Sequence, residues 1–210
     1  ENAVEPVISY LTSKGAVATA LEFETFKLAD GLHRLAYPWG MRNNLVVSTG
    51  PDGALIVDTG FNKRALDAIR KAIAGFGRGD IQCVINTHAH WDHIAGNGLA
   101  SSESAVIGSG KLDDLVRQGR MVRSDHGRQG PGGKSLPAPY LMKFNGQEIE
   151  IYPYPGLHSE ADILIYFRKA GVLCMGDLLL SQSCPAVREA TGYLELLDKV
   201  LDVFPSGTTF

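Results

Sequence analysis

The segment Cys83–Asn97, which reads CVINTHAHWDHIAGN, constrains the fold of this chain more strongly than any other. Its first residues, Cys83–Ile85, form a short apolar run that ends abruptly in polar residues, a pattern typical of a buried strand that opens into a loop. Four potential metal ligands follow closely: His88, His90, Asp92 and His93. A strand would point the last of them away from the other three, whereas a loop wrapped around a metal can use all four.

Imidazole and carboxylate groups at this density suit Zn(II), and Fe(II) or Mn(II) accept similar ligands. In α/β proteins, binding sites gather at the carboxyl ends of strands, which is where this cluster is expected to lie. The alternative is a polar loop whose histidines only cap the following helix. The density of ligands favours the metal site.

The overall composition narrows the class of protein. The chain has 210 residues, enough for one large domain with a substantial core. Its net charge of −3 gives no indication of binding to nucleic acid or to an anionic membrane surface, and no apolar run is long enough to span a bilayer. We therefore expect a single domain over residues 1–210, with residues 1–20 as an N-terminal arm. The sequence does not indicate an oligomeric state.

Alternating apolar residues predict three hairpins. The first two cover residues 23–37 and 45–57. The third covers residues 140–152 around Asn145-Gly146, a dipeptide that favours a type I′ turn. Further strands are expected at 163–167 and 172–175, helices at 63–74, 109–116 and 192–204, and the start of a last strand at Thr208.

Residues 117–139 differ in character from the rest of the chain, because Gly, Pro, Arg and Lys dominate and no periodicity survives. A loop this long inside a compact domain is usually functional or disordered. Its basic residues would favour an anionic substrate at a nearby site, and the alternative is a solvated loop. His126, a lone histidine within it, is expected to be exposed to solvent and not a metal ligand.

The run His88–His93 resembles the H-x-H-x-D-H signature of the metallo-β-lactamase superfamily. The resemblance covers most of the chain, from about Phe26 to Phe210. Two later segments carry it as well: GLHSEADILIYF around His158, and the Gly-Asp pair at Asp177 that follows an apolar run. It implies a four-layer αββα sandwich, in which two mixed sheets face each other, helices lie outside and metals lie along one edge.

The resemblance also implies a role for each candidate ligand. One metal would be held by His88, His90 and His158, and a second by Asp92, His93 and a later histidine, with Asp177 bridging the two. The segment 117–139 would lie over the active site.

Two further aspartates are expected to support this centre. Asp58 stands in an Asp-Thr-Gly sequence at the end of an apolar run, and the resemblance implies that it orients a metal ligand. The alternative for Asp58 is the N-cap of the next helix. Asp162 is expected to anchor the loop that carries His158 by accepting hydrogen bonds from backbone amides.

The activity implied by the resemblance is that of a zinc-dependent hydrolase that cleaves a small ester, lactone, thioester or amide with a metal-bound hydroxide. Two zinc ions would activate the water and polarise the carbonyl, and Asp92 would orient the nucleophile. Asp177 favours a site like that of glyoxalase II or lactonases over that of a dedicated β-lactamase. The alternatives are a β-lactamase-type amide hydrolase, an iron-dependent oxidoreductase like the persulfide dioxygenases, and a metal-binding protein without catalysis.

Each end of the sequence leads to a separate prediction. The family normally continues into a Pro-Gly-His-Gly sequence whose histidine completes the second metal site, so we expect the natural protein to extend beyond Phe210. The sequence begins with Glu1 and not with Met, which is typical of a removed signal peptide or a trimmed chain. Because related proteins are often exported, we expect a periplasmic or secreted protein, with the cytoplasm as the alternative.

Overall fold

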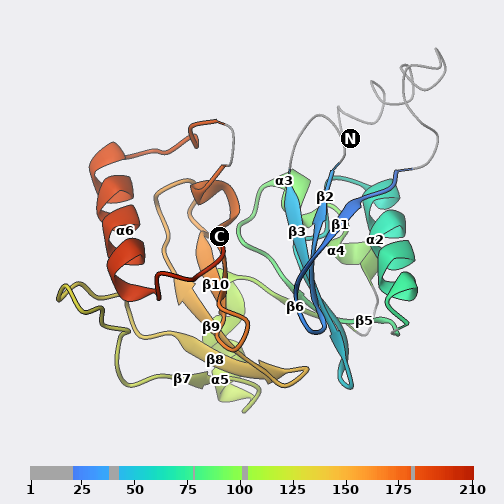
Figure 1. The fold of residues 1–210 in the computed structure, drawn as a ribbon, viewed down its shortest axis with the longest axis horizontal. Helices are drawn as coiled ribbons and strands as arrows, with labels where there is room; N and C mark the ends of the chain where they lie inside the picture. Colours follow the sequence, from blue (N-terminus) through green and yellow to red (C-terminus); the bar gives the residue numbers. More distant parts are fainter. Residues whose placement is uncertain (1–20, 38–42, 78, 101–103, 181–182) are drawn as a thin grey trace.

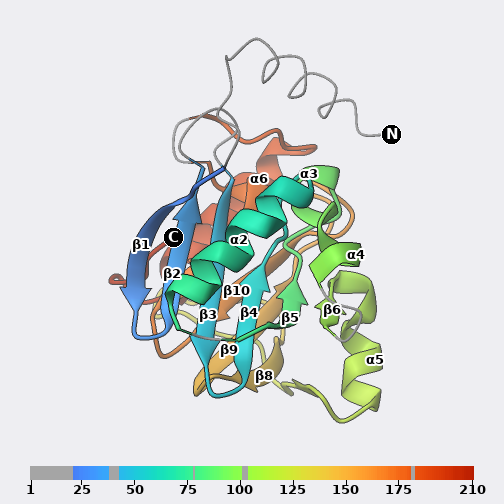
Figure 2. The ribbon, with the colours of Figure 1, turned by 90° about the vertical axis from the view of Figure 1, so that its right-hand side faces the viewer.

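In the computed structural model, which describes residues 21–37, 43–77, 79–100, 104–180 and 183–210, two β-sheets face each other and helices cover their outer sides (Figures 1 and 2). This arrangement confirms the predicted αββα fold. The expected N-terminal arm, residues 1–20, lies outside the described residues. Within the described part of the chain, no helix is long and apolar enough to cross a membrane.

Among the described residues, the first sheet has six strands in the order β1-β2-β3-β4-β5-β6. They are β1 (Glu24–Ala29), β2 (Leu32–Ala36), β3 (Asn44–Gly50), β4 (Gly53–Val57), β5 (Ile81–Ile85) and β6 (Ala105–Ile107). The first four pair as antiparallel neighbours, which confirms the first two predicted hairpins. β4, β5 and β6 run parallel, so their carboxyl ends meet at one edge of the sheet.

The described chain contributes five strands to the second sheet, in the order β11-β10-β9-β8-β7. They are β7 (Val122–Arg123), β8 (Tyr140–Phe144), β9 (Gln147–Pro153), β10 (Ile163–Phe167) and β11 (Val172–Cys174). β9 and β11 both run antiparallel to β10, so they end at the same edge. In the described residues, the strand expected at Thr208 is represented by one parallel bridge between Thr209 and Val172.

The helices lie outside the two sheets. They are α2 (Lys63–Gly75), α3 (Trp91–Ile94), α4 (Asn97–Ala100), α5 (Leu112–Arg117) and α6 (Ala190–Val203), with single 3₁₀ turns η1 (Ser109–Lys111) and η2 (Gly176–Leu178). α2 covers the first sheet and α6 covers the second (Figure 1). The helix expected over residues 109–116 is divided into η1 and α5.

Three layers of buried side chains lie between these four layers of elements. Along β4, successive side chains point to opposite faces, so Leu55 belongs to the same buried cluster as Ile165 while Ile56 belongs to the cluster that includes Leu66 of α2. On the far side, α6 packs Leu196 against the second sheet. Each fully buried aliphatic side chain stabilises the fold by about 1.5–3 kcal/mol, so the sandwich rests mainly on these layers.

Residues 117–139 do not lie over the edge where the candidate metal ligands gather, which corrects the expectation from the sequence. The segment packs beside α6 and the second sheet, at the end of the molecule away from α3 (Figure 1). Arg128 Nη1 lies 2.9 Å from Glu150 Oε2, and the backbone N–H of Gly132 donates to Asp202 Oδ1 at 2.6 Å. Glu150 is buried, and a buried carboxylate needs such a partner, which holds the segment in this place.

Several basic side chains of this segment form ion pairs. Four of them pair with acidic residues: Arg117 with Asp114, Arg123 with Asp113, Arg128 with Glu150, and Lys134 with Asp198. Among these four pairs, the one between Arg128 and Glu150 is the most buried. His126 is exposed, as the sequence predicts.

The predicted turn at Asn145 also fastens the two sheets together. Asn145 and Gly146 both have positive φ angles, 51° and 71°, as a type I′ turn requires. Asn145 Oδ1 accepts from the backbone N–H of Asp52 at 2.9 Å, and Asn145 Nδ2 donates to the carbonyl of Gly53 at 3.0 Å and to Ser48 Oγ at 3.2 Å. The β8–β9 turn is thereby clasped to the β3–β4 turn.

We expect Asn145→Gly to lower the free energy of unfolding by about 1–3 kcal/mol, since it removes the side-chain hydrogen bonds of the clasp while glycine tolerates the positive φ. Thermal unfolding followed by circular dichroism measures the change. Lys143→Ala, at an exposed position of the same hairpin, is the control and should change stability by less than about 0.5 kcal/mol. Equal melting temperatures for all three chains would show that the clasp adds nothing.

Candidate metal centre

Three histidines from two loops converge at the shared edge of the sheets. His88 and His90 lie in the loop after β5, and His158 lies in the loop after β9. His90 Nδ1 is 3.0 Å from His88 Nε2 and 2.9 Å from His158 Nε2. One ring nitrogen from each of the three lies within 4.8 Å of the others, close enough for all three to hold one metal ion.

The partners of these rings leave the converging nitrogens free to bind a metal. His158 Nδ1 is 2.7 Å from the carbonyl of Ala186, which can only accept, so Nδ1 carries the proton and Nε2 keeps its lone pair. The Thr87 hydroxyl donates to Asp58 and therefore accepts from His88 Nδ1 at 3.1 Å, which again leaves Nε2 free. Burial, together with the positive charge of His93, lowers the pKa of His88 to about 4, so this ring is neutral at pH 7.

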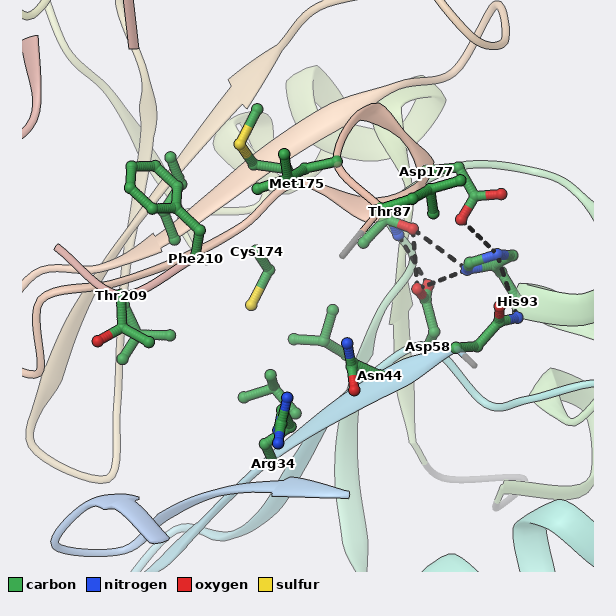
Figure 3. Close-up of a pocket in the computed structure, with 18 of the residues that line it drawn as sticks. Arg34, Asn44, Asp58, Thr87, His93, Cys174, Met175, Asp177, Thr209 and Phe210 are labelled. Atoms are coloured by element: carbon green, nitrogen blue, oxygen red, sulfur yellow. Dashed lines mark hydrogen bonds and ion pairs between the residues drawn. The ribbon is translucent and has the colours of Figure 1, made fainter. Parts of the chain in front are cut away.

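A second group of ligands adjoins the first and shares His88 with it: His88, His93 and Asp177. His93 Nε2 lies 3.3 Å from Asp177 Oδ1 (Figure 3). The other oxygen of Asp177 lies 3.6 Å from His158 Nε2. Asp177 therefore lies between the two groups.

His93 is surrounded by carboxylates. Its Nδ1 lies 2.8 Å from Asp58 Oδ2, and its Nε2 lies 3.5 Å from Asp92 Oδ2 in addition to the contact with Asp177. Burial opposes a charge on the ring, but hydrogen bonds to Asp177, Asp58 and Asp92 outweigh it and raise the pKa of His93 to about 12. The carboxylates around His93 therefore stabilise a positive charge, which a metal cation bound at Nε2 would supply.

Asp92 is held by a residue that the sequence did not single out. Asn43 Nδ2 donates to Asp92 Oδ2 at 3.0 Å. Burial works against ionisation of Asp92, yet the hydrogen bonds from His93 and Asn43 lower its pKa. Asn43 lies just before β3, far from the His88–His93 run in sequence. A lone asparagine before a strand has no sequence pattern from which its contact with Asp92 could be predicted.

Asp58 and Asp162 accept hydrogen bonds from the loops that carry the candidate ligands. Asp58 accepts from the backbone N–H and the hydroxyl of Thr87, both at 2.8 Å. It is not the N-cap of α2, because Asn62 accepts from Ala65 N in that position. Asp162 accepts from the backbone N–H of His158 at 2.8 Å, so its predicted anchoring of this loop is confirmed.

A pocket of about 800 Å³ opens beside the second group of ligands (Figure 3). Asp92, His93 and Asp177 form part of its lining, and apolar side chains such as Val57 and Met175 form much of the rest. A small group of polar side chains at the edge of a largely apolar pocket is typical of a site that binds a small molecule.

Comparisons with known proteins agree with this architecture. The family model described as the metallo-beta-lactamase superfamily matches residues 37–206. A hydroxyacylglutathione hydrolase from Synechococcus sp. (strain JA-2-3B'a(2-13)) is 28% identical over 114 residues, which are 53% of this chain and 40% of that protein. The chain thus spans about two fifths of the length of this curated relative.

Solved structures with low sequence identity share the fold. A metallo-beta-lactamase from Pontibacter korlensis has a TM-score of 0.65 at 15% identity, covering 88% of this chain and 87% of its own. A metallo-beta-lactamase family protein from Thermus thermophilus has a TM-score of 0.60 at 20% identity, covering 84% of this chain and 71% of its own. With the family model matching most of its length, this chain belongs to the metallo-beta-lactamase superfamily.

Proposed function

We propose that this chain is a metal-dependent hydrolase whose two adjoining ligand groups hold two zinc ions. The observation that carries the proposal is the convergence of His88, His90 and His158 beside a His93 ring that is enclosed by carboxylates. In this proposal His88, His90 and His158 hold the first metal, Asp92 and His93 hold the second, and Asp177 bridges both.

The chemistry of the donors supports zinc. Three neutral imidazole nitrogens are a sufficient set for a catalytic zinc ion with one position left open. The second group adds carboxylate oxygens, which Zn(II) also accepts, and Fe(II) or Mn(II) would bind the same set. When bound, zinc would supply the ability to lower the pKa of a water molecule and to polarise a carbonyl group.

The residues of the chain provide orientation and proton transfer. The ionised Asp92 carboxylate lies at the pocket, held by Asn43, where it would orient the attacking water and accept its proton. Asp177 would fix the separation of the two metals, and Asp58 would keep His93 in the ring orientation that turns Nε2 inward. The apolar walls of the pocket would exclude bulk water from the reacting groups.

The substrate class we propose is a small acyl compound: an ester, a lactone, a thioester or an amide. The match to a protein named hydroxyacylglutathione hydrolase supports a thioester in first place. A panel with one substrate of each kind, assayed with the zinc-loaded chain, tests this choice. Turnover of none of the four would contradict the proposed activity, and oxygen uptake by the iron-loaded chain would point to the oxidoreductase alternative.

We expect His88→Ala to lose at least one equivalent of bound zinc, because His88 is one of the three histidines proposed to hold the first metal. Elemental analysis of the purified, zinc-treated chain measures the metal content. His126→Ala is the matched control, since His126 is exposed and lies outside both groups. Unchanged zinc content in His88→Ala would remove His88 from the metal centre.

We expect Asp177→Asn to lower kcat by about 100-fold or more while the fold persists, because a neutral amide is a weaker ligand than a carboxylate of the same shape. Steady-state kinetics on the best substrate of the panel measures the effect, and circular dichroism checks the fold. Asp125→Asn, an exposed aspartate away from the site, is the control. Full activity in Asp177→Asn would argue that no metal depends on this carboxylate.

A further inference from the structure

Thr87 contacts each segment that carries a ligand of the proposed centre, although its own side chain belongs to neither ligand group. We infer that Thr87 is the positioning residue that fixes the two ligand groups relative to each other. This role rests on the proposed function, since it concerns the geometry of the same two metal sites.

The hydroxyl of Thr87 connects one ligand from each group. It donates to Asp58 Oδ2 at 2.8 Å and accepts from His88 Nδ1 at 3.1 Å. The same oxygen of Asp58 lies 2.8 Å from His93 Nδ1. A short chain of hydrogen bonds therefore runs from His88 through Thr87 and Asp58 to His93, and it sets the protonated nitrogen of both rings. Figure 3 shows the part of this chain that joins Thr87, Asp58 and His93.

The backbone of Thr87 reaches the loop that carries His158. The carbonyl of Thr87 accepts from the backbone N–H of Ile163 at 2.9 Å. Ile163 follows Asp162, whose carboxylate holds the backbone N–H of His158. The position of the third histidine is thus tied to Thr87 through two consecutive residues, Asp162 and Ile163.

The side-chain carbon atoms of Thr87 lie close to the backbone just before Asp177. Gly176 precedes Asp177 and has a φ of +54°, and a Cβ built on it would lie 2.7 Å from Thr87 Cβ. Only glycine fits this contact, for reasons of space and of backbone conformation. The backbone that carries Asp177 therefore rests directly on Thr87.

Because Thr87 is buried, a water molecule cannot readily take the place of its hydroxyl group. Thr87 is 3% exposed, so water has little access to the groups that its hydroxyl serves. Without the hydroxyl, Asp58 loses a donor and the His88 Nδ1–H loses its acceptor, and buried groups left unpaired in this way favour rearrangement. Because the hydroxyl orients His88 of the first site directly and His93 of the second site through Asp58, the loss should weaken both metal sites together.

The test is zinc binding by the full 210-residue chain, measured by competition with a chromophoric chelator, together with the absorption spectrum of the cobalt-substituted chain. Thr87→Val keeps the shape and removes the hydroxyl, and Thr87→Ser keeps the hydroxyl. Thr59→Val is the matched control, because Thr59 is also buried and its hydroxyl bonds to the carbonyl of His93 and to Asn97 but to no imidazole. Circular dichroism establishes that each chain is folded.

We expect Thr87→Val to bind zinc about 10–100-fold more weakly at both sites, with altered cobalt bands, because groups that orient ligands contribute this much to metal affinity. Thr87→Ser should restore most of the affinity and the wild-type spectrum, and Thr59→Val should keep both. If Thr87→Val fails to fold, Thr87→Ser and Thr87→Ala give the same comparison, since they differ by the hydroxyl alone.

Two results would overturn the role of Thr87 while leaving the metal centre intact. One is wild-type affinity and spectrum in the chains that lack the hydroxyl. The other is an equal loss in Thr59→Val, which would reduce the effect to general loosening of the loop. Absence of zinc binding by the wild-type chain would instead overturn the proposed function itself, so the two failures are distinguishable.

Discussion

The buried carboxylate of Asp58 is the constraint on which the rest of the site depends. It is 2% exposed and lies on a residue with a φ of 64°, so both its charge and its backbone conformation are costly on their own. Two donors from Thr87 and one from His93 offset that cost. These donors lie beyond β5, so Asp58 is stable only when β4 and β5 are paired and the loop after β5 is folded back over it.

The topology of the two sheets explains why the ligands meet. β4 and β5 are parallel neighbours, and α2 connects them, so Asp58 and the His88–His93 run emerge at one edge of the first sheet. β9 and β11 lie on either side of β10 in the second sheet, so His158 and Asp177 emerge together as well. The buried layer between the sheets holds these two edges at a fixed distance, so the candidate ligands from both sheets keep their relative positions.

The charged residues of the segment 117–139 show how composition can mislead about function. In the sequence, its basic residues were compatible with an anionic substrate or with a solvated loop. In the structure, Arg128 meets the buried Glu150 and lies 5.2 Å from the centroid of the Phe204 ring, which packs the segment beside α6. The acids that pair with this segment include residues more than twenty positions away, such as Glu150 and Asp198, so the sequence around the loop could not reveal them.

The sequence alone determined the features that depend on neighbouring residues: the strands and helices from their periodicity, the turn at Asn145-Gly146, and a dense ligand cluster at His88–His93. His158 and Asp177 entered only through the resemblance to a family, because a lone histidine or aspartate in a loop carries no local signal. The contacts of Asn43 and Thr87, the path of 117–139 and the joining of the ligand groups were decided by the tertiary structure. Each of these depends on which strands lie side by side, and strand pairing joins residues that are far apart along the chain.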